Sequence, residues 1–205
     1  MLRCCLLLLS CGVMNGLIAQ TPSFVPGQAL MRFAEGTPQR AKILEVSRTN
    51  PLDLSGLETV TDDLRARIRV PLYVEKLGSG DWLTLAVDRQ PLAEAIEQFL
   101  RGENGVIAVT RQDATSGQTD GLRFLITIAP GSDLQRVFER RAENDGLAAI
   151  VDRWTAAVSV PLRETGDPGH LVIEVDWSAA TLELVDRLSA LPEVEAAQPN
   201  YSQMR

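Results

Sequence analysis

Hydrophobic and polar positions follow the same order twice along this chain. In the first half, short alternating runs predict strands over 28–33, 64–70, 82–87 and 106–110. The second half predicts strands over 122–128, 154–160, 171–175 and 194–197. Apolar residues at helical spacing, with capping residues before them, predict two helices in each half, beginning near Thr37, Pro91, Ser132 and Ser178. Each half is therefore predicted to have the order β-α-β-β-α-β.

The two halves align as copies. Pro71 matches Pro161, 90 positions later, Leu83 matches Leu171, 88 positions later, and Phe33 matches Ile128, 95 positions later. Strand patterns that survive while the offset drifts indicate a duplication with different loop lengths. We predict an α+β protein of two tandem ferredoxin-like domains with antiparallel sheets. Their predicted bounds are 24–113 and 120–201, followed by a tail over 202–205.

In such a domain two helices cover one face of the sheet and leave the other face open. In the first copy the open face is predicted to be charged, with Arg65, Arg67 and Arg69 pointing outward beside Arg32 and Thr84. In the second copy it is predicted to be small and mildly apolar, and its residues are Thr155, Ala157, Ser159, Thr127 and Val172. Interface cores are depleted in charge, so we expect the second face to dock a protein. The alternative is that the two copies pack on each other through these faces.

Composition and the first residues bear on location. The 205-residue chain has a formal net charge of −7, which argues against nucleic-acid binding. Residues 1–19 resemble a signal peptide, with Arg3 before a short apolar run and Ala19 before the expected cleavage site. Export to the periplasm or the outside of the cell is therefore expected. The alternative is a lipobox at Leu8–Gly12, which would attach the chain to the membrane through a lipid on Cys11. Either cleavage leaves no pair of cysteines for a disulfide.

The sequence offers little for catalysis. His170 is the only histidine and follows the turn Pro168-Gly169, where a solvated loop residue is expected. The adjacent acids Asp62 and Asp63 are typical of a solvated loop or a helix start. No histidine or cysteine cluster has metal-ligand spacing, and glycines occur singly at turns, so we expect no metal and no cofactor. We predict that the protein is not an enzyme.

Two motifs near the ends of the mature chain carry a family resemblance. The opening Phe24-Val25-Pro26-Gly27-Gln28-Ala29-Leu30-Met31-Arg32-Phe33-Ala34-Glu35-Gly36 resembles the "PGxxLVxFxxG" start of subtilisin-family prodomains, particularly the fervidolysin-like kind. The closing Pro192-Glu193-Val194-Glu195-Ala196-Ala197-Gln198-Pro199-Asn200-Tyr201 resembles their "P-x-V-x-x-A-x-P-N-Y" end. The resemblance implies a ferredoxin-like fold that assists the folding of a subtilisin-like serine protease and then inhibits it. It also implies a sheet that docks on the enzyme and a C-terminal tail that lies in the substrate cleft.

The chain departs from that family in its organisation. The opening motif is on the first copy and the closing motif is on the second, and the His-Gly and Gly-Thr-Ser-Met motifs of the protease domain are missing. We therefore expect an inhibitor or folding assistant that acts in trans on a subtilisin-like protease. The alternatives are an interaction or structural module of the cell envelope and an orphaned remnant of a split precursor. The target protease and the oligomeric state stay open.

The tail is the expected inhibitory element. Pro199 favours an extended exit from the last strand, and the residues after it can add as a strand along an enzyme cleft. The residues of this predicted tail are Asn200, Tyr201, Ser202, Gln203, Met204 and Arg205. Tyr201 supplies a large amphipathic side chain that could anchor the contact. The alternative is a frayed terminus with no role.

Overall fold

The computed structural model describes residues 24–112, 121–142, 145–167 and 169–201, and the structure is that of an α+β protein. The described residues form two four-stranded antiparallel sheets and six α-helices. The predicted fold class is confirmed at this level. The predicted signal peptide over 1–19, Cys11 and the tail residues 202–205 lie outside the described residues.

Among the described residues, the strands and α-helices follow the order β1-α1-α2-β2-β3-α3-β4-β5-α4-α5-β6-β7-α6-β8. The strands are β1 Phe24–Phe33, β2 Leu72–Leu77, β3 Leu83–Val87, β4 Val106–Gln112, β5 Arg123–Ile128, β6 Leu162–Glu164, β7 Leu171–Val175 and β8 Val194–Tyr201. The α-helices are α1 Pro38–Thr49, α2 Glu58–Ile68, α3 Arg89–Arg101, α4 Asp133–Glu139, α5 Gly146–Val158 and α6 Trp177–Ser189. Two short 3₁₀ turns, η1 Leu54–Leu57 and η2 Ser79–Asp81, join the other elements of the first half.

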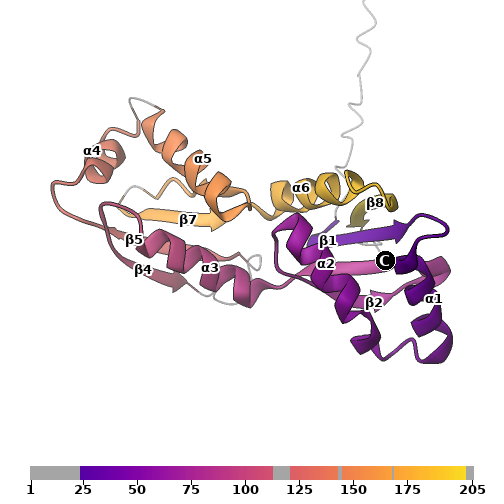
Figure 1. Cartoon of the computed structure of the whole chain (residues 1–205). Helices are drawn as coiled ribbons and strands as arrows, with labels where there is room; N and C mark the ends of the chain where they lie inside the picture. The colour runs from indigo at the N-terminus through magenta and orange to yellow at the C-terminus, as the bar shows by residue number, and fades with distance from the viewer. Residues whose placement is uncertain (1–23, 113–120, 143–144, 168, 202–205) are drawn as a thin grey trace, which may run out of the picture.

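The sheets do not follow the predicted division of the chain. One sheet has the strand order β2-β3-β1-β8 and the other has the order β4-β5-β7-β6. The last strand of each copy therefore belongs to the sheet of the other copy, and bounds of 24–113 and 120–201 do not describe the two bodies. Figure 1 shows the result, with the yellow segment α6–β8 lying in the indigo and purple body. We call residues 24–87 with 177–201 unit A, and residues 89–112 with 121–175 unit B.

The two units share one strand register. In unit A, Leu30 of β1 lies opposite Thr84 of β3 and Gln198 of β8. In unit B, Leu125 of β5 lies opposite Val172 of β7 and Thr110 of β4. These residues correspond at the offsets found in the sequence, and both ladders are also irregular near the matching positions Phe33 and Ile128. The two sheets therefore have the same pairing at matching positions, with the last segment of each half in the other sheet.

Two predicted strands are helices. The stretch 64–70 belongs largely to α2, whose buried Val60, Leu64 and Ile68 are four residues apart. Arg69 ends this helix with a left-handed backbone (φ 61°), and Pro71 follows. The stretch 154–160 belongs largely to α5, which ends at the equivalent left-handed residue Ser159 (φ 59°). The alternation was a short-range coincidence, because the apolar period over the longer window is helical.

Two of the four predicted helix starts, at Thr37 and Ser132, are confirmed, and α3 begins at Arg89, two residues before the predicted Pro91. Thr37 accepts a hydrogen bond from the backbone N–H of Arg40 at 3.3 Å, and Ser132 accepts one from Gln135 at 3.1 Å. The predicted cap Ser178 is wrong. Helix α6 begins earlier, because the carboxylate of Asp176 accepts from the backbone N–H groups of both Ser178 and Ala179.

Candidate docking surface

The residues predicted to form the docking face of the second copy do not lie on one sheet face. Thr155 and Ala157 are on α5, and Ser159 ends that helix. Val172 is in strand β7, where it is 7% exposed, and Thr127 is in strand β5. The predicted charged face is wrong for its three central arginines, because Arg65 and Arg67 are on α2 and Arg69 follows it. Arg32 and Thr84 of that prediction do lie in the sheet.

Two of these residues instead protect the outer edges of the sheets. The guanidinium Nε of Arg65 donates to the carbonyl of Leu72 at 2.5 Å, at the start of edge strand β2. At the equivalent position of unit B, Thr155 accepts a hydrogen bond from the backbone N–H of Leu162, at the start of β6. Occupied edge groups reduce the tendency of a strand to pair with another chain. Arg65 and Thr155 therefore have a structural role at the sheet edges.

The sheet of unit A has a nearly uncharged open face. Its other face packs on the core, since Ala29, Met31 and Phe33 of β1 are buried. The alternate positions of β1 and their cross-strand partners form the open face, and their residues are Gln28, Leu30, Tyr73, Thr84, Ala86, Ala196, Gln198 and Asn200. Thr84 and Ala86 at its centre are only 1% and 4% exposed. Arg32 and Lys76 supply positive charge toward one end.

This face joins the two sequence motifs. Strand β1 lies in the opening motif and β8 lies in the closing motif, and the two strands are antiparallel neighbours. The amide of Asn200 donates to the amide oxygen of Gln28 at 2.6 Å. The rings of Phe24 and Tyr201 meet edge to face, with centroids 6.4 Å apart. Asn200 and Tyr201 are thus the end of a paired strand, so the predicted tail can begin only after Tyr201.

An ion-pair network fastens one end of the two strands. Glu195 of β8 lies 2.5 Å from Arg32 of β1 and 3.1 Å from Arg40 of α1, measured between nitrogen and oxygen. Arg40 also donates from Nε to Asp81 at 2.5 Å. Asp81 is 8% exposed and has a left-handed backbone (φ 63°). The guanidinium of Arg32 stacks 5.2 Å from the centroid of Trp82. The network holds β8 to β1 by side chains as well as by backbone hydrogen bonds.

The residues considered for catalysis remain apart. His170 is exposed, and its Nδ1 lies 3.3 Å from a carboxylate oxygen of Asp167. The hydrogen bond from the backbone N–H of Gly169 lowers the pKa of Asp167, so this carboxylate mainly organises its own turn. Asp62 and Asp63 pair with Arg65 and Arg67 along α2. Among the described residues, no group of three or more histidine, cysteine, aspartate or glutamate side chains could hold a metal ion.

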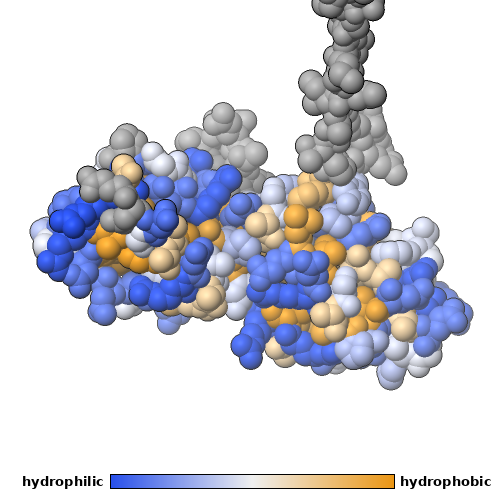
Figure 2. All heavy atoms as spheres, turned by 90° about the horizontal axis from the view of Figure 1, so that it is seen from above, coloured by the Kyte–Doolittle hydropathy of each residue, from blue (hydrophilic) through white to orange (hydrophobic). Residues whose placement is uncertain are grey.

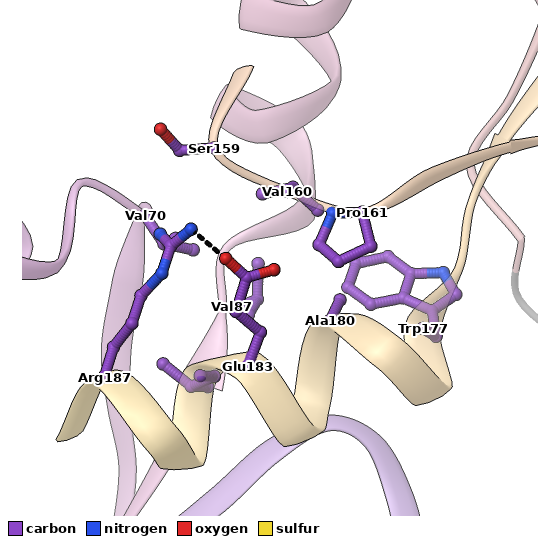
Figure 3. Close-up of a pocket in the computed structure, with 10 residues that line it drawn as sticks. Val70, Val87, Ser159, Val160, Pro161, Trp177, Ala180, Glu183 and Arg187 are labelled. Atoms are coloured by element: carbon purple, nitrogen blue, oxygen red, sulfur yellow. Dashed lines mark hydrogen bonds and ion pairs between the residues drawn. The ribbon is translucent and has the colours of Figure 1, made fainter. Parts of the chain in front are cut away.

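A small hollow lies where the two units meet. Figure 3 shows it where α6 passes the chain before β6, with Trp177 and Ala180 on one side and Val160 and Pro161 on the other. Its volume of about 10 Å³ has room for roughly one water molecule. Arg187 closes one side by pairing with Glu183 and donating to the carbonyl of Ile68 at 3.0 Å. Such a hollow is too small for a substrate.

Figure 2 shows hydrophobic residues reaching the surface of both units in separate patches bordered by hydrophilic ones. The large exposed apolar side chains among the described residues are Leu52, Tyr73, Ile107, Leu182 and Tyr201. Two of these, Tyr73 and Tyr201, belong to the sheet of unit A. No helix in the described ranges is both long enough and apolar enough to cross a bilayer.

No protein-family model, curated protein or solved structure matches this chain. The open face of unit A was missed by sequence reasoning, because β8 was assigned to the other copy and edge strand β2 was predicted over 64–70, which is mostly helix α2. The signal was present in the regular alternation of β1, whose even-numbered residues had to face away from the core.

Proposed function

We propose that this protein is an exported, propeptide-like protein that binds a subtilisin-like serine protease in trans, as an inhibitor or as a folding assistant. The observation that carries the proposal is the pairing of β1 with β8. The opening and closing motifs lie in opposite copies of the sequence but in one sheet of the structure. Unit A therefore combines both features of the family that the motifs resemble, and the proposed role is binding rather than catalysis.

We further propose that each unit is ferredoxin-like. The strand orders β2-β3-β1-β8 and β6-β7-β5-β4 are the same when the exchanged segments are counted in the unit that they complete. Each unit then has the order β-α-β-β-α-β, with the region between its first two strands divided into two helices. Unit B has neither motif on its strands, so we assign protease binding to unit A.

The open face of unit A suits a protein partner. Its central side chains are small or uncharged, and charge-poor surfaces dominate the cores of protein interfaces. Strand β8 is an edge strand of this sheet, and residues 202–205 follow it in the sequence. A partner docked on the sheet would therefore lie close to the start of the tail. This arrangement supports one continuous contact that includes the sheet and the residues after Tyr201.

Inhibition assays on a panel of subtilisin-like proteases test the proposal. Gln198→Glu places a charge on an exposed position of the face, and its matched control is Thr110→Glu at the equivalent exposed position of unit B. We expect Gln198→Glu to weaken inhibition by at least about tenfold, because the new carboxylate would be desolvated without a partner. Thr110→Glu and Ala157→Glu should leave inhibition unchanged.

Deleting Ser202–Arg205 separates the tail from the sheet. We expect the deletion to weaken inhibition far more than it lowers the melting temperature, since the tail contributes binding and not core packing. Equal inhibition by the truncated and intact proteins would remove the tail from the mechanism. If no protease of the panel is bound or inhibited by the intact protein, the alternative of an envelope interaction module is favoured.

A further inference from the structure

The exchange of helix–strand segments needs a cause. As far as backbone pairing is concerned, segment 89–112 and segment 177–201 could each complete either sheet, because both form the same ladder in the same register. In the alternative arrangement, segment 89–112 would complete the sheet of β1 and segment 177–201 would complete the sheet of β5. Side chains must therefore decide between the two arrangements, and the duplicated positions allow each contact to be compared with its counterpart.

The first set of contacts is electrostatic. Glu193 and Glu195, just before and within β8, pair with three arginines of unit A, which are Arg32, Arg40 and Arg67. The hydrogen bond from Arg67 lowers the pKa of Glu193, and the hydrogen bond to Glu193 raises the pKa of Arg67. Both carboxylates thus have partners that the rest of unit A supplies.

The counterparts lack this charge pattern altogether. The positions equivalent to Glu193 and Glu195 in the other segment are Gly105 and Ile107. The positions equivalent to the three arginines in unit B are Thr127, Gln135 and Ala157. If segment 89–112 completed unit A, the three arginines would lose the two carboxylates of the β8 segment, although Arg40 would keep Asp81 and Arg67 would keep Asp63. If segment 177–201 completed unit B, two carboxylates would face uncharged residues.

The second set of contacts depends on shape. Trp177 at the start of α6 lies so close to Gly27 that a Cβ there would be 3.1 Å from the indole ring. The backbone N–H of Gly27 donates to the hydroxyl of Thr181 on the same helix at 2.8 Å. The residue equivalent to Gly27 in unit B is the buried Leu122, which has no room for an indole in that place. The residues equivalent to Trp177 and Thr181 are Arg89 and Ala93.

The third set of contacts holds segment 89–112 in unit B. Glu103, in the turn between α3 and β4, accepts a hydrogen bond from the indole N–H of the buried Trp154 at 2.7 Å. It also pairs with Arg153 at 2.6 Å. The residue equivalent to Glu103 is Leu191, and the residues equivalent to Trp154 and Arg153 are Leu64 and Asp63. Returning Glu103 to unit A would place it beside an aspartate and leave the indole N–H of Trp154 without its acceptor.

We infer that each unit selects the helix–strand segment of the other copy through these contacts, so that exchange is specified by side chains. Unit A recognises segment 177–201 through three arginines and Gly27, which contact Glu193, Glu195 and Trp177. Unit B recognises segment 89–112 through Trp154 and Arg153, which both contact Glu103. This inference concerns assembly and does not rest on protease binding.

Competition between two cross-links measures the selection. The protein would be the full chain with its three cysteines changed to serine and with Leu30→Cys, Gln198→Cys and Thr110→Cys added. Cross-strand neighbours on one face are close enough for a short bismaleimide. After refolding from denaturant, peptide mass analysis gives the ratio of the 30–198 product to the 30–110 product. We expect the 30–198 product alone to be abundant, and a dominant 30–110 product would overturn the exchange itself.

Transposing the carboxylates tests the cause. The four changes are Glu103→Leu, Ile107→Glu, Leu191→Glu and Glu195→Ile, which keep the composition and net charge unchanged. We expect the share of the 30–110 product to rise at least about tenfold, since Arg32, Arg40 and Trp154 would then find their carboxylates in the unexchanged segments. Only the contacts of Glu193, Trp177 and Thr181 would still favour exchange. The double variant Ile107→Glu with Glu195→Ile alters only exposed positions, and its product ratio is used if the fourfold variant fails to refold.

The control transposition is Gln112→Asn with Asn200→Gln, which should leave the ratio of the 30–198 and 30–110 products unchanged. An unchanged ratio in the refolded fourfold variant, or in the double variant standing in for it, would overturn the inference.

Discussion

The open faces of the two sheets have the same strand pairing but opposite chemistry. In unit B, Glu174 at the centre of the face is 6% exposed and lies between two arginines, 2.6 Å from Arg123 and 2.6 Å from Arg163. The equivalent three positions of unit A are occupied by Ala86, Gln28 and Tyr73, which carry no charge. One face is closed by its own ion pairs, and the other leaves small and amphipathic groups without such pairs.

This difference indicates which face is available to a partner. Arg123 and Arg163 both direct hydrogen bonds to one carboxylate, so docking on unit B would compete with interactions already made. Docking on unit A would displace no ion pair from the centre of the face. The costs of desolvating charge therefore favour unit A as the interface. Sheets with the same strand pairing thus have a face covered by ion pairs in unit B and a face with an uncharged centre in unit A.

Placing a carboxylate in unit A should have the largest effect on stability. Ala86→Glu copies Glu174 into a buried position without its arginines, and we expect a loss of about 3 kcal/mol in the free energy of unfolding, measured by urea denaturation. Adding Gln28→Arg and Tyr73→Arg supplies the missing partners and should recover most of the loss. A triple variant no more stable than Ala86→Glu would show that the two faces differ by more than these side chains.

The helix–strand exchange explains why the fold was only partly predictable. Alternation and capping located β1, β5, β7 and the starts of α1 and α4, because those signals are local. Helix α2 was missed because the alternation over Arg65–Arg69 is typical of a strand, while its helical apolar spacing begins earlier, at Val60. Helix α5 was missed over 154–160 in the same way, since its buried positions begin at Leu147. The exchange itself leaves no mark on hydrophobic periodicity, since both copies of each strand have the same pattern.

The candidate site was misplaced for the same reason. Assigning β8 to its own copy separated the opening motif from the closing motif and left each copy with one. The side chains that distinguish the copies were visible in the sequence as Glu193 and Glu195 against Gly105 and Ile107. Their meaning depends on which arginines they meet, and only the three-dimensional pairing supplies that.

A second prediction compares two glycines of unit A that have the same backbone conformation. Gly27 and Gly36 both have φ of +78°, but only Gly27 lies against a side chain, the indole of Trp177. Alanine at Gly36 should cost about 1 kcal/mol from the left-handed backbone alone. Alanine at Gly27 should cost about 2 kcal/mol, because the indole must also move. Chemical denaturation of the two variants measures the difference, and equal losses would mean that Trp177 adapts without cost.

The smallest expected effect is the pH dependence of the Glu193–Arg67 pair, which has no counterpart in unit B. The pKa of Glu193 in the folded protein lies below its ordinary value of 4.5, chiefly because Arg67 donates a hydrogen bond to the carboxylate. A folded-state pKa below the unfolded one adds stability that is fully present above pH 4.5 and is lost as the pH falls through the folded pKa. Glu193→Gln should therefore lower the free energy of unfolding by about 0.5–1 kcal/mol at pH 7, and the gap from the parent protein should close as the medium becomes more acidic than pH 4.5. Glu75→Gln, at an exposed position of β2, controls for the loss of one negative charge. A gap that stays constant through this acid range would mean that the pair does not contribute to stability through ionisation, and the selection of β8 by unit A would then rest on Glu195 and Gly27.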